Sequence, residues 1–154
     1  MEQYKKIYLA GNISSNPETY AWRDVAVKRL QNHYILLNPA ANGFNRKLIN
    51  EAKGKPEEFL VKAITRSKGI LISKDFQLVD ASDIILVNLA IVNPDKPMIG
   101  TMFEMAWAWY LHKPIIAIIS DNIYCKHPFP GCAISATTQT IDEACDLILE
   151  FFVE

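Results

Sequence analysis

Short apolar runs alternate with helical patterns along the 154-residue chain. The apolar runs have the length of strands and lie at Lys6 to Gly11 (KIYLAG), 34–39 (YILLNP), 83–90 (DIILVNLA), 113–120 (KPIIAIIS) and about 134–138. Such alternation is typical of βαβ units around a parallel sheet. The run at 83–90 is nearly all apolar, as expected of a central strand that is covered on both faces. The pattern therefore predicts one α/β domain over residues 1–154, a three-layer α/β/α sandwich with a five-stranded, mostly parallel sheet.

Helices are predicted at about 19–31, where apolar positions recur with a period near 3.6, and at 56–67, 73–81, from Thr101 and from Thr140. Thr140 and Glu143 have the spacing of a capping box, which marks the start of the last helix. Two stretches, 40–55 and 121–133, lack such a pattern and are expected to be irregular. A long loop such as 40–55 is often a lid or a binding loop.

Composition narrows the classes of function. Half of the residues are hydrophobic, the formal net charge is −1, and no dense basic run occurs, which argues against a nucleic acid polymer as partner. The longest apolar runs fall short of the roughly 20 residues that a membrane helix needs, and the N-terminus lacks the apolar core of a signal peptide. Three cysteines, an odd number, favour reduced thiols over a disulfide framework. We expect a cytoplasmic protein without a membrane partner.

Familiar cofactor and metal motifs are missing from the sequence. The segment GNISSNP after the first apolar run is not the dinucleotide-binding G-x-G-x-x-G, and there is no P-loop lysine motif. His33, His112 and His127 are scattered, and no pair has metal-ligand spacing. No serine lies in a G-x-S-x-G turn. The sequence therefore predicts neither a metal nor another cofactor.

One acidic residue, Glu104, lies in the most apolar segment, MIGTMFEMAWAWYLHKP. A buried ionised carboxylate is costly unless it is paired or hydrogen-bonded, so two interpretations are open. Thr101 and Glu104 have capping-box spacing, in which case the glutamate binds amides at the start of its own helix. Alternatively, Glu104 faces a ligand site, because Gly100 lets a ligand approach the backbone and this helix end is a polar opening in an apolar segment.

Ligands of open parallel sheets bind beyond the carboxyl ends of the strands. The residues predicted at that edge are Tyr8 to Asn12, Asn38, Asn88, Ser120 and Asp121, and the first helical turn with Glu104 faces the same crevice. Two nearby aspartates also have simpler interpretations. Asp83 suits a turn before a strand, and Asp75 suits the first turn of a helix capped by Ser73.

Three segments resemble the nucleoside 2-deoxyribosyltransferase family, which includes deoxynucleoside-monophosphate N-glycosidases. They are KIYLAG, KDFQLVDASDIILVNL and GTMFEMAWAWYLHKPIIAI, in the family's order over nearly the whole chain. The G-T-x-x-E segment is the most specific part, and the eight-residue step from Asp75 to Asp83 matches the family's spacing. The resemblance implies a flavodoxin-like Rossmann variant. It also implies a homo-oligomer, a dimer or a hexamer built from dimers, in which neighbouring subunits complete each active site.

The resemblance assigns three catalytic roles. Glu104 would be the nucleophile that attacks the anomeric carbon of a 2-deoxyribonucleoside and holds the sugar as a covalent ester. Asp75 would protonate or hydrogen-bond the departing base, and Tyr8 would orient the glutamate. These residue types suit the chemistry, because retaining glycosidases also need a carboxylate nucleophile and an acid for the leaving group. The expected function is 2-deoxyribosyl transfer between nucleobases, with small-molecule nucleosides or nucleotides and free bases as partners.

Substrate contacts are expected from Gly11, Asn12, Ser14, Arg23, Asn88, Asp95, Gly100 and Thr101. Many family members carry an acid or a serine two positions before the glycine of the G-T motif; Met98 stands there in this chain, and Asp95 is the candidate substitute. Family members that hydrolyse nucleotides bind a 5′-phosphate at the first turn. Asn12, Ser14, Ser15 and Arg23 fit that role or are simple turn formers. Two alternatives stay open: a 2′-deoxynucleoside 5′-monophosphate N-glycosidase, and a non-catalytic nucleotide-binding module.

Overall fold

The computed structural model describes residues 4–14, 16–41, 46–47, 50–51, 53–56, 58, 62 and 69–153. At its centre is a five-stranded sheet with the order β2-β1-β3-β4-β5, in which every neighbouring pair is parallel. The strands are β1 (Lys6–Gly11), β2 (Ile35–Leu37), β3 (Ile84–Asn88), β4 (Ile115–Ile118) and β5 (Ala136–Thr138). The predicted α/β fold with a five-stranded parallel sheet is confirmed, and its strand order is that of flavodoxin-like proteins.

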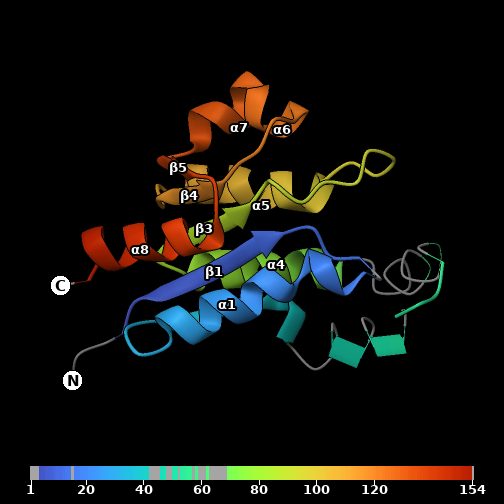
Figure 1. The fold of residues 1–154 in the computed structure, drawn as a ribbon, viewed down its shortest axis with the longest axis horizontal. Coiled ribbons are helices and arrows are strands. Elements are labelled where there is room, and N and C mark those ends of the chain that lie inside the picture. The colour runs from blue at the N-terminus through green and yellow to red at the C-terminus, as the bar shows by residue number, and fades with distance from the viewer. Residues whose placement is uncertain are drawn as a thin grey trace.

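Helices cover both faces of this sheet (Figure 1). The helices are α1 (Ala21–Leu30), α4 (Ile70–Ala81), α5 (Ile99–Tyr110), α6 (Ile123–Lys126), α7 (Pro128–Ala133) and α8 (Ile141–Phe151), with 3-10 turns η1 (Pro17–Thr19) and η2 (Pro39–Ala41). α1 and α8 pack together on one face, and α4 and α5 pack together on the other. α7 packs against α5 and α6.

Two apolar cores lie on the two faces of the sheet. Ile7 and Leu9 of β1 belong to the core beneath α1 and α8, whereas Tyr8 and Ala10 belong to the core beneath α4 and α5. Successive side chains of a strand point to opposite faces, which explains the division. β3 is buried at every position, as its apolar run predicts. The pleat of β1 therefore directs Tyr8 towards the helices that carry Asp75 and Glu104.

The start of α5 differs from the prediction. The helix begins at Ile99, and Met98 occupies the N-cap position without a side-chain cap. Thr101 lies inside the helix, so the capping box of Thr101 and Glu104 was wrong. The amide of Met98 instead donates to the Tyr124 hydroxyl at 2.8 Å. A tertiary contact with α6 therefore takes the place of the predicted local cap.

The predicted start of α8 is confirmed, whereas the predicted start of α4 is wrong. α8 begins as predicted, since Thr140 accepts a hydrogen bond from the Glu143 amide at 3.1 Å. α4 begins at Ile70 behind Gly69, so Ser73 is not its N-cap.

Residues 121–133, predicted to be irregular, form the two short helices α6 and α7 instead. Asn122 caps α6 by accepting from the Tyr124 amide at 3.0 Å, and His127 Nδ1 caps α7 by accepting from the Phe129 amide at 3.2 Å. With four and six residues, these helices are too short to produce a recognisable 3.6-residue period.

The predicted loop at 40–55 and the predicted helix at 56–67 lie largely outside the described residues. Positions 46–47 and 50–51 are helical, so the loop prediction was wrong there, and positions 58 and 62 are helical as predicted. Within the described ranges, no helix is long and apolar enough to cross a membrane. The three cysteines are free.

Candidate active site

A group of buried polar side chains lies where α4 and α5 cover β1. Tyr8 of β1 is fully buried, Glu104 of α5 is 7 % exposed, and Asp75 of α4 is partly buried. In the part of the chain that the structure describes, the buried side-chain polar atoms without a hydrogen-bond partner are Tyr8 Oη, Asp75 Oδ1 and Glu104 Oε2. Because buried polar atoms are almost always hydrogen-bonded, three such oxygens in one group indicate a place that binds polar atoms of a ligand.

The three side chains influence one another electrostatically. The pKa of Glu104 is raised to about 8, first by burial and then by the negative charge of Asp75, while Arg23 and the Tyr8 hydroxyl act in the opposite direction. Burial raises the pKa of Asp75 to about 6 against the charge of Lys74. Burial and the charges of Glu104 and Asp75 raise the pKa of Tyr8 well above its usual value. Tyr8 and Glu104 thus interact, although no hydrogen bond of normal geometry joins them.

The position of Glu104 in its helix follows from the early start of α5. Glu104 lies in the second turn, not in the first, and no side chain caps the start of the helix. At this helix start, the Tyr124 hydroxyl accepts a hydrogen bond from the Met98 amide. The structural interpretation of Glu104 as a capping residue was therefore wrong, and its carboxylate faces Tyr8 and the charge of Asp75 instead.

The turn after β1 is organised around Arg23, which is fully buried. Its guanidinium donates to four backbone oxygens: those of Gly11 at 2.9 Å, Thr19 at 3.2 Å, and Leu9 and Asn12 at 3.4 Å. All three guanidinium nitrogens thus have a partner within the protein. The predicted contact of Arg23 with a substrate would have to compete with these internal hydrogen bonds.

Ser14 is also used inside this turn. Its hydroxyl donates to the Thr19 hydroxyl at 3.1 Å and accepts from the amide of Asn16 at 3.0 Å. Asn12, the other described polar residue predicted here, is partly buried, and Ser15 lies outside the described residues. Ser14, Asn16 and Thr19 therefore satisfy one another's hydrogen-bonding groups, as turn formers do.

Gly11 and Asn88 end the two central strands side by side, paired across β1 and β3. Gly11 has φ 156°, and a Cβ at this position would lie 3.1 Å from the Trp22 ring and 3.5 Å from the Arg23 guanidinium. Both backbone conformation and space therefore favour glycine. Asn88 is buried, and its Oδ1 accepts from the Ala90 amide at 3.0 Å, which turns the chain away from β3.

The remaining predicted substrate contacts are dispersed. Thr101 is buried one turn before Glu104. Gly100 is exposed, and a Cβ there would have nothing within 4 Å. Asp95 is exposed in the loop between β3 and α5, where its amide donates to Asn93 Oδ1 at 2.9 Å. The structure thus does not bring Asp95 into the buried group.

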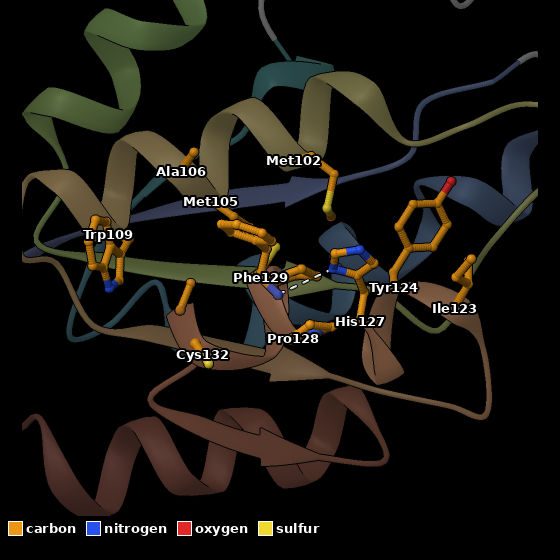
Figure 2. Close-up of a pocket in the computed structure, with 12 residues that line it drawn as sticks. Met102, Met105, Ala106, Trp109, Ile123, Tyr124, His127, Pro128, Phe129 and Cys132 are labelled. Carbon is orange, nitrogen blue, oxygen red and sulfur yellow. Dashed lines mark hydrogen bonds between the residues drawn. The ribbon is translucent and has the colours of Figure 1, made fainter.

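A separate apolar pocket of about 790 Å³ lies between α5 and the short helices α6 and α7 (Figure 2). Met102, Ala106 and Trp109 line it from the side of α5 that, at 3.6 residues per turn, points away from Glu104. No carboxylate lines this pocket, and none of the predicted site residues contributes to it. Sequence reasoning missed it because its far wall is built by α6 and α7, which the pattern did not reveal.

No group of three or more His, Cys, Asp or Glu side chains suited to a metal ion occurs among the described residues. Residues 7–145 match the sequence model of the nucleoside 2-deoxyribosyltransferase family. Because this match covers most of the chain, the protein belongs to that family. None of the curated protein sequences matches the chain significantly.

Two solved structures share the fold. A 2-deoxyribosyltransferase from Leishmania mexicana has 16 % sequence identity and a TM-score of 0.56, covering 96 % of this chain and 99 % of its own. The CMP N-glycosidase BcmB from Clostridium botulinum has 12 % identity and a TM-score of 0.52, covering 94 % of this chain and 98 % of its own. At such identities the likeness shows the fold alone.

Proposed function

We propose that this protein transfers 2-deoxyribosyl groups between nucleobases through a covalent intermediate on Glu104. The observation that carries the proposal is the buried group of Glu104, Asp75 and Tyr8, whose three oxygens lack partners among the described residues. Membership of the nucleoside 2-deoxyribosyltransferase family supports the reaction class. The start of α5 supports the proposal too, because this helix begins at Ile99 and does not use the carboxylate of Glu104 as a cap.

The reaction follows the two-step logic of retaining glycosidases. The Glu104 carboxylate attacks the anomeric carbon, the N-glycosidic bond breaks, and its electron pair stays on the base nitrogen, which takes a proton from Asp75. In the second step an incoming base attacks the same carbon, the ester bond to Glu104 breaks, and Asp75 takes up the proton of the incoming base. Burial of Glu104 restricts the access of water, which would otherwise hydrolyse the ester.

The protonation states that the reaction requires of Glu104 and Asp75 determine the pH range of activity. Catalysis needs Glu104 ionised and Asp75 protonated, but the pKa of Glu104 is about 8 and that of Asp75 about 6. Between these values the total number of protons is correct, and about one molecule in a hundred holds the proton on Asp75, since the two pKa values differ by two units. We therefore expect kcat/KM to be highest between about pH 6 and about pH 8.

The first turn favours nucleosides over nucleotides as substrates. Arg23 and Ser14, the described residues best suited to a 5′-phosphate, use their polar atoms within the protein. A phosphate would have to displace those hydrogen bonds. The 5′-monophosphate N-glycosidase with water as acceptor is for this reason the second choice on the same catalytic group.

A homo-oligomer is part of the proposal. One side of the molecule, here called the α4–α5 face, exposes Ile72, Phe76, Ile99, Phe103 and Tyr110. Trp107 of α5 links the two helices of this face by an edge-on contact with Phe76 of α4, at a ring-centre distance of 5.3 Å. It makes a second edge-on contact, at 5.8 Å, with Phe103 of its own helix. Exposed apolar side chains that gather on one face are typical of an interaction surface.

Product analysis by chromatography tests the proposal. The protein is incubated with deoxyinosine or thymidine, with and without free adenine, and with the corresponding 5′-monophosphates. Deoxyadenosine formed from a nucleoside plus adenine, and absent with Glu104→Gln, is the expected result. Free base released from the monophosphates alone would replace the transferase with the N-glycosidase. Absence of turnover in every mixture would leave the binding module.

A further inference from the structure

The buried arginine of α1 has no part in the reaction described above. Arg23 is the largest side chain that is fully buried among the described residues. It reaches the carboxyl end of β1, where Nε donates to Leu9, Nη2 to Gly11, and Nη1 to Asn12 and Thr19. A guanidinium suits this task, because its donors are fixed in one plane and can serve several oxygens at once.

These contacts fix the backbone next to Tyr8. Leu9 directly follows Tyr8 in β1, and Gly11 is the last residue of the strand. The guanidinium carbon lies 4.7 Å from the centre of the Trp22 ring, and a Cβ at Gly11 would make a tight contact of 3.1 Å with the same ring. The Arg23 guanidinium is thus fixed in place by the Trp22 ring and by four backbone carbonyl oxygens.

The charge of Arg23 also reaches the catalytic group. All of its hydrogen-bond acceptors in the described residues are neutral carbonyl oxygens, so no carboxylate is bonded to it directly. Glu104, when ionised, is attracted to it: this attraction raises the pKa of Arg23 and lowers that of Glu104 against the larger effect of burial. Burial lowers the pKa of Arg23 to about 10, so it stays positive at neutral pH.

The groups that act on Glu104 come from three elements. Asp75 of α4 is acidic, Tyr8 of β1 is a neutral phenol, and Arg23 of α1 is positive. Among the described groups around Glu104, the guanidinium is therefore the one that stabilises the ionised carboxylate by its full charge.

We infer that Arg23 is a positioning residue of the candidate active site: it holds the end of β1 beside Tyr8 and supplies the positive charge that favours the ionised, nucleophilic form of Glu104. The catalytic meaning of this inference rests on the proposed function, whereas the coupling between Arg23 and Glu104 exists without turnover. The inference also gives Arg23 a task other than phosphate binding.

Direct titration of Glu104 tests the coupling. Carbon-13 NMR of glutamate side-chain carboxyls, with Glu104→Gln for assignment, gives the titration midpoint of Glu104. In Arg23→Gln we expect the midpoint to rise by about one pH unit and kcat/KM between pH 6 and 8 to fall about tenfold, with its alkaline limb moved upward by the same amount. Arg23→Lys keeps a positive charge and should restore much of both values. Arg29→Gln is the matched control on α1, because Arg29 binds Asp142 and Asp146 at the surface.

A wild-type measurement covers the case in which Arg23→Gln does not fold. The Nε–Hε resonance of Arg23 should shift with the midpoint of Glu104 and lose that titration in Glu104→Gln. The inference is overturned if the titration midpoint of Glu104 is unchanged in folded Arg23→Gln. It is also overturned if the Arg23 Nε–Hε resonance does not shift with the titration of Glu104. Should the protein lack turnover, the proposed function fails while both NMR results still decide the coupling.

Discussion

Glu104 links the chemistry of the site to the stability of the fold. Its pKa rises from an ordinary value of 4.5 to about 8 on folding. An acid with a raised pKa binds its proton more tightly in the folded state, so its contribution to stability is full below the unfolded value and is lost as pH rises through the folded value. For Glu104 this window extends from about pH 4.5 to about pH 8, and Asp75 acts in the same direction between 3.8 and about 6.

Glu104→Gln should remove most of this pH dependence. We expect the free energy of unfolding of the wild type to fall between pH 5 and pH 8, by an amount on the order of a few kcal/mol at about 1.4 kcal/mol per pKa unit. The variant, neutral at every pH, should lose most of that slope while its turnover drops at least about a thousandfold. Urea denaturation at pH 5, 6.5 and 8 measures the slopes. Glu18→Gln, at an exposed position, is the control, and equal slopes for wild type and Glu104→Gln would contradict the assignment.

Asp75→Asn separates the two carboxylates in the pH profile. Loss of the general acid should lower kcat/KM by about 10²- to 10⁴-fold and change both limbs. The alkaline limb should disappear, because no acid remains to lose its proton, and kcat/KM should rise with pH through the titration of Glu104. The midpoint of that titration should lie below about 8, because the Asp75 charge that raises the pKa of Glu104 is gone. Initial rates of base exchange from pH 5 to 9 provide the test. A profile that keeps both limbs would exclude Asp75 as the acid.

At the scale of single residues, the sequence predicted which residues belong to the candidate site but not where their side chains point. The three proposed catalytic residues are 67 and 29 positions apart in the chain, and in the structure Glu104 and Asp75 both act electrostatically on Tyr8. The family resemblance suggests Arg23 and Ser14 as phosphate ligands, because they belong to the turn after the first strand. Spacing along a turn does not tell whether such side chains point outward or into the protein, and here both point into hydrogen bonds of the turn.

The elements differ in how far their limits follow from local sequence. α8 starts where its capping box predicts, since Thr140 and Glu143 provide the hydrogen bonds within one turn. α5 starts two residues before the apparent capping box, because the Tyr124 hydroxyl, 26 positions further along, accepts the Met98 amide. A cap supplied by another element leaves no local pattern, so this start could not be predicted from the sequence.

Tyr124→Phe tests the tertiary cap of α5. The variant keeps the ring and removes the hydroxyl that accepts from Met98 at 2.8 Å, so we expect a loss of about 1 kcal/mol in the free energy of unfolding. Urea denaturation is the measurement. Tyr4→Phe makes the same change at an exposed tyrosine before β1 and should stay within about 0.5 kcal/mol of the wild type. Equal effects of the two substitutions would speak against the cap.

The layered architecture was predictable because the central strands are continuous apolar runs and the helices α1, α4 and α5 each lie between two strands in the chain. β3 illustrates this, since every residue from Ile84 to Asn88 is buried. The same reasoning did not reveal α6, α7 or the pocket that they form beside α5 (Figure 2). Helices of one or two turns bury too few residues to establish a period, so their existence depends on caps and on packing against α5.

The distribution of exposed apolar side chains gives the whole molecule two unlike sides. On α5, Ile99, Phe103 and Tyr110 follow helical spacing and form one stripe, with Tyr110 74 % exposed. Exposed apolar residues are fewer on α1 and α8, where salt bridges from Arg29 to Asp142 and Asp146 cross the surface. Because α5 also carries Glu104, a subunit that packs on the α4–α5 face would lie next to the proposed catalytic group.

The double substitution Ile99→Glu and Tyr110→Glu tests that arrangement. Two carboxylates in the stripe would have to lose water in an apolar contact, so the proposed homo-oligomer should dissociate. Sedimentation velocity at micromolar concentration should show an oligomer for the wild type and a monomer for the variant, and base exchange should decline with dissociation if neighbouring subunits complete each site. Phe151→Glu, on the exposed end of α8, places a carboxylate on the other side and should leave the oligomer intact. A wild type that sediments as a monomer would show that the α4–α5 face has a different task, and the catalytic group would then have to function within one chain.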